Sequence, residues 1–212
     1  MEIGITTYSR PIILYRCLEN IRQYHPDVKI IVFDDNSPEV ELSQKTLNDF
    51  GVMYKKWEKT IGPEGNNQRF LEHFNRYKVD RWLLLDDDIT FNAPFLELAE
   101  TKFDEGFEHL YIRTAREDRI QFMGAFIGGT QKLLDKIGGF NIERFSGYGG
   151  GHVDWQFRAI NNKIATEIKI DYNLQETKTA NKQLKNEWEL RPKDFRFKDL
   201  GRTDNKKYIK II

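Results

Sequence analysis

The sequence contains little cysteine, no long apolar run and no excess charge of either sign, and each absence excludes a class of protein. Cys17 is the single cysteine among 212 residues, which excludes an internal disulfide framework and a cysteine-based zinc site. Apolar runs such as residues 82–85 are far shorter than a bilayer span. The first residues lack the basic and apolar regions of a signal peptide, so we expect a cytoplasmic protein without a membrane span.

The balance of charge conceals an uneven distribution along the chain. There are 33 Lys and Arg against 33 Asp and Glu, but residues 175–212 carry eleven Lys and Arg against six Asp and Glu. Such a run is usually a solvated face, and the functional alternative is a basic lid over an anionic ligand. Residues 208–212 read as if a longer protein had been cut at this point, so we expect further domains of a longer polypeptide to follow.

The order of apolar runs predicts an α/β protein with a mostly parallel sheet. Short apolar segments alternate with helix-like periods in the first half, which is typical of parallel strands joined by helices. Strands are expected at residues 3–5, 28–33, 52–57 and 81–85. A first helix is expected with Ser9 as its cap and Pro11 in its first turn, and further helices are expected at 40–50 and 64–77. Later segments predict a strand pair at 110–114 and 119–126 and helices at 131–137 and 152–162. Cys17 falls on the buried face of the first helix.

Three polar clusters follow successive predicted strands, at residues 6–10, 34–37 and 86–88. The carboxyl ends of parallel strands meet at one edge of a sheet, where ligands bind in such folds. We therefore expect the clusters to share one rim.

The cluster Asp86-Asp87-Asp88 points most sharply to chemistry. Adjacent carboxylates repel each other unless a cation lies among them, and Mg²⁺ is typically held by one or two carboxylates plus substrate phosphates. Asp88 and Asp86 are thus candidate ligands for Mn²⁺ or Mg²⁺. The alternative is an acidic turn that caps a helix starting at Ala93.

The other two clusters allow structural interpretations as well. Asp34 and Asp35 could accept hydrogen bonds from a base or ribose, or they could form a capping turn. Thr6, Tyr8 and Arg10 could line a base pocket, with Tyr8 stacking on the ring and Arg10 reaching a phosphate. The alternative for these three is a capped junction between loop and helix.

A glycine-rich loop at residues 138–151 precedes His152 and Asp154. Asp154 at the start of a helix is a candidate general base, although a carboxylate there is also favoured by the helix dipole alone. His152 could bind a metal or position substrate, but a lone histidine more often does neither.

The ordered set of motifs resembles the GT-A nucleotide-sugar glycosyltransferases of the family-2 kind. The resemblance covers residues 2–160 and rests on the three clusters, on Ile137-Gly138-Gly139-Phe140 and on the loop through Asp154, which is also similar to a loop of galactosyltransferases. It implies a Rossmann-like sheet in a single domain over residues 1–212. Within it, residues 1–90 would bind nucleotide, 91–172 would hold acceptor and catalytic groups, and 173–212 would form the basic segment.

The resemblance also implies roles for individual residues. The donor would contact Thr6, Tyr8, Arg10, Asp34, Asp35, Asn67, Arg69, Asp86 and Asp87. The metal would bind Asp88 and Asp86, Asp154 would deprotonate the acceptor, and Tyr148 and Trp155 would form the acceptor platform. Family members usually have two acidic residues where this chain has His152-Val153-Asp154, so the identity of the base and the stereochemical outcome stay open. Because Asp87 is acidic as well, the metal-binding pair could be displaced by one residue along the chain.

The implied activity is transfer of a hexose or deoxyhexose from a UDP-sugar to a glycan or glycoprotein. The short form without an anchor is also similar to the N-terminal domain of a chlorella-virus capsid glycosyltransferase, which implies a capsid-protein glycan as acceptor and a location in the host cytoplasm. Nucleic acid is not expected as a partner, because residues 1–174 are acidic.

Three other functions are weighed against this one. Asp86 to Thr90 matches the nucleophile motif of haloacid-dehalogenase-type phosphatases, with Asp86 as nucleophile and Asp88 as acid/base, but no downstream aspartate pair follows. A non-catalytic nucleotide-sugar-binding module is another candidate, and it would not need Asp154. A nucleotidyltransferase would need a basic glycine-rich loop where Thr6 to Arg10 stand.

Overall fold

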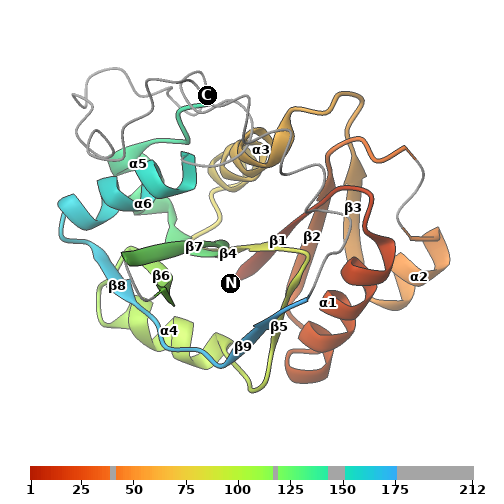
Figure 1. Cartoon of the computed structure of the whole chain (residues 1–212), viewed down its shortest axis with the longest axis horizontal. Helices are drawn as coiled ribbons and strands as arrows, with labels where there is room; N and C mark the ends of the chain where they lie inside the picture. The colour runs from red at the N-terminus through yellow and green to blue at the C-terminus, as the bar shows by residue number, and fades with distance from the viewer. Residues whose placement is uncertain (39–41, 117–118, 143–150, 176–212) are drawn as a thin grey trace.

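The computed structural model describes residues 1–38, 42–116, 119–142 and 151–175 and shows an α/β fold around one mixed sheet (Figure 1). The strands are β1 (Glu2–Thr7), β2 (Lys29–Asp34), β3 (Val52–Lys56), β4 (Arg81–Asp86), β5 (Ile89–Phe91), β6 (His109–Arg116), β7 (Arg119–Thr130), β8 (Ala165–Glu167) and β9 (Tyr172–Leu174). The helices are α1 (Pro11–Tyr24), α2 (Gln44–Asp49), α3 (Gly62–Arg76), α4 (Leu96–Asp104), α5 (Gln131–Ile137) and α6 (Gly151–Asn161).

The main sheet has seven strands in the order β3-β2-β1-β4-β7-β6-β8. Strands β3, β2, β1 and β4 are parallel, β7 runs antiparallel to both β4 and β6, and β8 is parallel to β6. Strands β5 and β9 form a separate antiparallel ribbon. The predicted mostly parallel sheet flanked by helices is confirmed.

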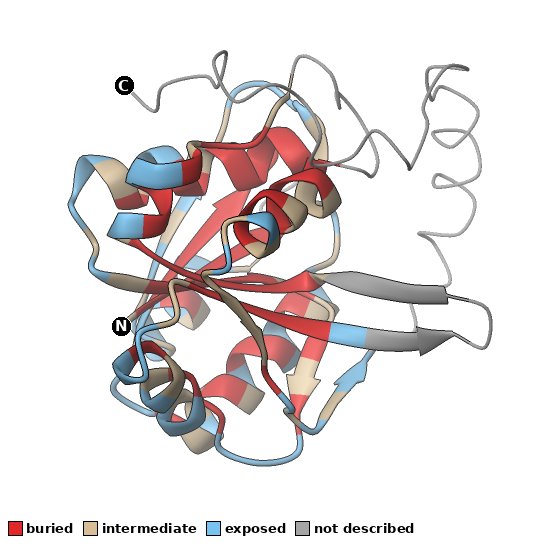
Figure 2. Cartoon of the chain, turned by 90° about the vertical axis from the view of Figure 1, so that its left-hand side faces the viewer, coloured by how far each residue is buried: buried red, intermediate tan, exposed pale blue. Residues whose placement is uncertain are grey.

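Helices cover both faces of the sheet, so the core has two halves. Alternate residues of β4 face opposite ways: Leu83 and Leu85 pack with α1 and α4, whereas Trp82 and Leu84 pack with α3, α5 and α6. Figure 2 shows buried residues on both faces of the sheet, between the two helical layers. This arrangement explains the continuous apolar run in β4, since neither face meets water. Cys17 lies in the first half-core, as predicted.

Two local predictions were wrong. Ser9 does not cap α1, because Arg10 occupies the N-cap position and makes no side-chain cap. Ser9 instead has a positive φ of 53°, and its backbone N–H donates to Ser37 Oγ at 2.8 Å. Helix α2 is also shorter than the predicted residues 40–50. The three-residue strands β5, β8 and β9 carry too few residues for a periodic signal.

Gly4 allows α3 to lie close against β1. A Cβ atom at this position would lie 2.6 Å from two ring atoms of Phe70, closer than real side chains approach. The missing side chain thus lets the Phe70 ring pack directly on the strand. This contact sets how closely α3 approaches β1, and the first turns of α3 contribute to the candidate site.

Within the described residues, no helix combines the length and the hydropathy that crossing a membrane requires.

Gly4→Ala should lower the free energy of unfolding by about 1–3 kcal/mol, because the added methyl group overpacks the contact with Phe70. Urea denaturation measures the loss. The same change should cost less in a Phe70→Leu background, where the ring is gone, and simply additive losses would contradict the proposed clash.

Candidate functional site

Polar segments meet at the carboxyl ends of β1, β2 and β4. In the parallel register Thr6 lies beside Asp86, and Thr7 lies beside Asp34. The prediction that the three polar clusters share one rim of the sheet is therefore confirmed. This rim is the usual ligand edge of a parallel sheet.

The three consecutive aspartates form the turn between β4 and β5. Thr6 Oγ1 donates to Asp86 Oδ1 at 3.2 Å, and Thr7 Oγ1 donates to Asp87 Oδ2 at 2.7 Å. Asp87 is fully buried, whereas Asp86 and Asp88 remain partly exposed. Asp87 therefore anchors the turn to β1, and the other two carboxylates are the ones that a ligand can reach.

The alternative interpretation of this cluster as a helix cap is wrong. Strand β5 follows the aspartates directly, and α4 begins only at Leu96, with Phe95 at its N-cap. The carboxylates are therefore not explained by the helix that comes after them.

Arg10 is the cation that the structure places among these carboxylates. Its guanidinium forms ion pairs with Asp87 and, at 3.2 Å, with Asp88 Oδ2. Burial and the neighbouring Asp88 raise the pKa of Asp86 to about 6, and burial raises the pKa of Asp87 to about 8 although Arg10 opposes the shift. One guanidinium thus does not offset three crowded carboxylates, and an added cation would relieve the remaining repulsion.

Asp34 closes the turn after β2. Its Oδ1 accepts hydrogen bonds from the backbone N–H and the hydroxyl of Ser37, both at 2.7 Å, and its Oδ2 accepts one from Tyr54. The side chain is fully buried. These contacts are those of the turn interpretation, and contact between Asp34 and a nucleotide stays a prediction.

Asp35 ties the end of β2 to the start of α3. It accepts hydrogen bonds from Ile61 N at 3.0 Å, from Gly62 N at 2.8 Å and from Arg69 Nη1 at 2.9 Å. Burial raises the pKa of Asp35, and these donors oppose the rise. The Arg69 guanidinium also lies 4.4 Å from the centre of the Trp57 ring. The predicted donor residues Asp35 and Arg69 are therefore brought into direct contact.

Two further predicted donor residues lie at the same end of the sheet. Asn67, early in α3, is buried, and its Oδ1 has no hydrogen-bond partner among the described residues. A buried amide oxygen of this kind is readily satisfied by a ligand donor. Tyr8, just after β1, is partly exposed.

Glu64 and His152 connect the start of α3 with the start of α6. His152 Nδ1 lies 3.0 Å from Glu64 Oε1, and the same oxygen accepts the backbone N–H of His152 at 3.3 Å. Sequence reasoning did not select Glu64. The available signal was an acidic residue in the first turn of a helix that opens with Gly62-Pro63.

Asp154 is buried and forms an ion pair with Arg158 one turn later on α6. Arg158 Nε donates to Asp154 Oδ2 at 3.2 Å, and the same guanidinium donates to the backbone carbonyls of Ile137 and, at 2.7 Å, of Gly139. The exposed fraction is 1% for the Asp154 side chain and 2% for that of Arg158. These contacts of Arg158 join α6 to the end of α5. The i, i+4 spacing of Asp154 and Arg158 is the sequence feature that could have predicted the ion pair.

The acceptor platform needs correction. Trp155 was expected to contact acceptor, but it is fully buried, stacks on Phe140 and donates its indole N–H to Gly138 O at 2.8 Å. A ring inside the core cannot bind a sugar. Tyr148 lies outside the described residues, as does most of the glycine-rich loop.

The last described residue is attached beside the aspartates. Gln175 N donates to Asp88 O at 2.7 Å, and Gln175 Nε2 donates to Ile13 O at 3.2 Å. Residues 176–212, which make up most of the expected basic lid, lie outside the described part of the chain.

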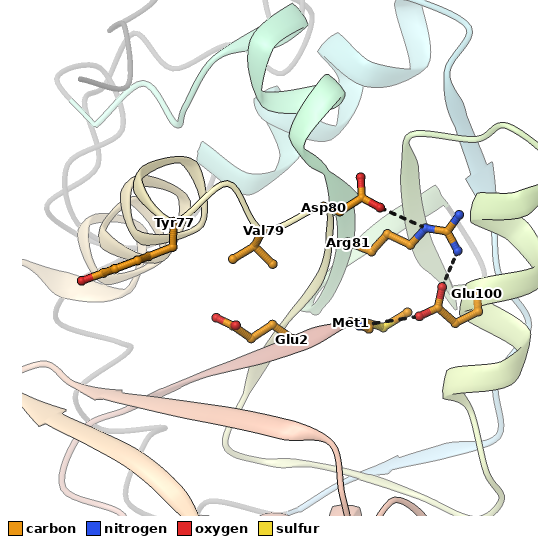
Figure 3. Close-up of a pocket in the computed structure, with 7 residues that line it drawn as sticks. All are labelled: Met1, Glu2, Tyr77, Val79, Asp80, Arg81 and Glu100. Carbon is orange, nitrogen blue, oxygen red and sulfur yellow. Dashed lines mark hydrogen bonds and ion pairs between the residues drawn. The ribbon is translucent and has the colours of Figure 1, made fainter.

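A pocket in the structure lies at the opposite end of the same strands (Figure 3). It is lined by Glu2, Arg81 and Glu100, among others, and an ion pair joins Arg81 to Glu100. Glu2 and Arg81 begin β1 and β4, whereas the aspartates end β4. This pocket is therefore separate from the candidate site.

The sequence profile of glycosyl transferase family 2 matches residues 2–165. The chain belongs to this family. The family match spans the rim, the aspartate turn and α6. No curated protein matches the sequence significantly.

Solved structures share the fold at low identity. TarS from S. aureus is 15% identical with a TM-score of 0.64, over 83% of this chain but only 37% of that one. Its fragment 1–349 in complex with UDP-GlcNAc is 14% identical with a TM-score of 0.62, over 84% of this chain and 59% of that one. This chain thus spans well under two thirds of TarS.

A second solved protein is glucosyl-3-phosphoglycerate synthase from Mycobacterium tuberculosis, in complex with Mn²⁺, UDP and glucosyl-3-phosphoglycerate. It is 12% identical with a TM-score of 0.63, over 86% of this chain and 74% of that one. These matches support the GT-A fold. They do not favour the phosphatase alternative, and they give no support to a chlorella-virus origin.

Arg158→Ala should lower the free energy of unfolding by about 3–5 kcal/mol, because it leaves the Asp154 carboxylate buried without its cation. Thermal or urea denaturation measures the change. Lys102→Ala, which removes the exposed ion pair with Glu105, is the matched control and should cost less than about 1 kcal/mol. Equal losses in the two variants would contradict the assigned role of the buried pair.

Proposed function

We propose that this chain transfers a sugar, a hexose or deoxyhexose, from a UDP-sugar to a hydroxyl group of a glycan or glycoprotein. The observation that carries the proposal is the aspartate turn after β4, which lies beside Arg10 at the ligand edge of a family-2 fold. Relatives of the same fold were solved with UDP-GlcNAc and with UDP and Mn²⁺, which supports a UDP-sugar as donor.

In this proposal the donor lies along the rim between β1 and α3. Residues on β1 and the loop after it would flank the nucleotide, and the start of α3 would supply further contacts. The residues involved are Thr6, Tyr8, Arg10, Asp35, Asn67 and Arg69. The buried Oδ1 of Asn67, with no partner among the described residues, gives this side of the rim an acceptor for a ligand N–H or O–H.

The residues present fit a divalent metal that arrives with its nucleotide. Mg²⁺ is commonly bound by one or two carboxylates together with substrate phosphates, and Mn²⁺ also suits oxygen ligands. Asp88 and Asp86 supply two partly exposed carboxylates. The described residues contain no group of three side chains able to hold a metal, so the diphosphate would have to complete the coordination.

The bound ion would neutralise charge that develops on the departing UDP. Arg10, now paired with Asp87 and Asp88, is placed to add positive charge at the same point. Because negative charge builds up on the diphosphate as its bond to the sugar breaks, these contacts would strengthen in the transition state and speed the transfer.

Calorimetric titration with UDP, with and without Mn²⁺, tests the donor site. We expect metal-dependent binding that weakens at least about tenfold in Asp88→Ala, the loss of roughly 1.4 kcal/mol of interaction. Asp80→Ala is the control, because Asp80 is an exposed aspartate just before the opposite end of β4.

Absence of UDP binding under both conditions would reject the donor assignment, and a phosphatase assay would then test the alternative use of Asp86 and Asp88. UDP binding without release of UDP from any UDP-sugar would instead identify a non-catalytic binding module.

A further inference from the structure

The Glu64–His152 pair joins two helices that are far apart in the sequence, and His152 acts electrostatically on Asp86 of the aspartate turn. Their contact of 3.0 Å joins α3 to α6. A protonated His152 would lower the pKa of Asp86, which places the ring within electrostatic reach of the aspartate turn. The His152 side chain is 21% exposed and that of Glu64 only 3%. The carboxylate is thus enclosed, while the ring remains partly accessible to solvent.

Glu64 is buried in a way that calls for a positive partner. Its Oε1 contacts the ring and backbone of His152, and its Oε2 has no hydrogen-bond partner among the described residues. Among the contacts described, the His152 ring is the group placed to balance the charge of this buried carboxylate. The 3.0 Å contact therefore sets a carboxylate against Nδ1, so a positive charge on the ring would meet an opposite charge.

Two glycines make room for the pair. A Cβ at Gly151 would lie 2.7 Å from Glu64 Oε2, and one at Gly124 on β7 would lie 3.2 Å from His152 Nε2. Any larger residue at these positions would displace the carboxylate or the ring. The surroundings of the pair are therefore shaped to hold both groups in one arrangement.

Asp154, the other candidate base, is placed differently. Its carboxylate is 1% exposed and pairs with Arg158, which is tied in turn to the carbonyls of Ile137 and Gly139. A carboxylate that is enclosed in this way and held by a guanidinium is not exposed to an acceptor hydroxyl. Of the two, His152 has the exposure and the partner that proton transfer requires.

We propose that His152 is the proton acceptor of the sugar transfer and that Glu64 positions its ring. This inference rests on the proposed function. The acceptor oxygen forms a bond to the anomeric carbon while the bond from that carbon to the diphosphate oxygen breaks, and its electron pair leaves with UDP. The acceptor proton passes to His152 Nε2, and Nδ1–H stays hydrogen-bonded to Glu64, whose negative charge balances the imidazolium.

His152→Asn tests the catalytic role with little change in shape, since the asparagine amide can replace Nδ1 in the contact with Glu64 but offers no base. The probe is UDP release from UDP-glucose, UDP-galactose and UDP-GlcNAc with water as acceptor. We expect kcat to fall by about 10²–10⁴-fold, the usual contribution of a general base. Calorimetric affinity for UDP with Mn²⁺ should stay within about threefold of wild type.

Glu64→Gln tests the positioning role, because it keeps the size of the side chain and removes its charge. We expect kcat to fall at least about tenfold with the donor KM unchanged. Long-range ¹H–¹⁵N NMR of the histidine rings supplies a readout independent of turnover. The wild-type His152 resonances, assigned by their loss in His152→Asn, should show the Nδ1–H tautomer, and Glu64→Gln should shift them.

The possible results distinguish failure of the role of His152 from failure of the proposed transferase activity. If His152→Asn turns over at the wild-type rate, or if only Asp154→Asn loses turnover, the inference is overturned and the proposed transferase activity stands. Loss of Mn²⁺-dependent UDP affinity in His152→Asn would make His152 a metal ligand and overturn it too. A wild type that binds UDP but releases none from any donor rejects both, and a His152 ring in the Nε2–H tautomer rejects the role of Glu64.

Discussion

Repulsion among the three carboxylates after β4 is the constraint around which the site is arranged. The turn holds Asp86, Asp87 and Asp88 together only because threonine hydroxyls on β1 and the guanidinium of Arg10 share their charge. Stability alone would favour fewer acidic groups at this point, and Arg10 is the cation that the described residues place among them. The parallel register of β1 and β4 places the hydroxyls of Thr6 and Thr7 opposite the carboxylates of Asp86 and Asp87.

The rest of the rim is built from connections between separate elements. Asp35 clamps the start of α3 to the end of β2, and the Asp154–Arg158 pair clamps α6 to the end of α5. Both are charged contacts made mostly away from water, so each depends on its partner being present. They fix the positions of the two helices that bring Glu64 and His152 together. Rigid elements of this kind are what a precisely spaced reaction site needs.

The strand order and the shared rim could be predicted because both follow from apolar runs ended by polar residues. Leu83 to Leu85 has no alternation, which correctly indicates a strand covered on two faces. Side-chain direction could not be predicted in the same way. Trp155 looks like an acceptor-binding residue in the sequence, yet α6 turns its ring into the core, and the burial of Asp154 was not foreseen either. Glu64 lies 88 positions from His152, and no local pattern reveals a contact at that separation.

The short ribbon of β5 and β9 has a consequence for whatever is joined to this domain. It brings the backbone of Gln175 into a hydrogen bond with Asp88, so the chain continues from a point adjoining the aspartate turn. A segment tethered there experiences an effective concentration at the rim that is on the order of millimolar, whatever its own affinity.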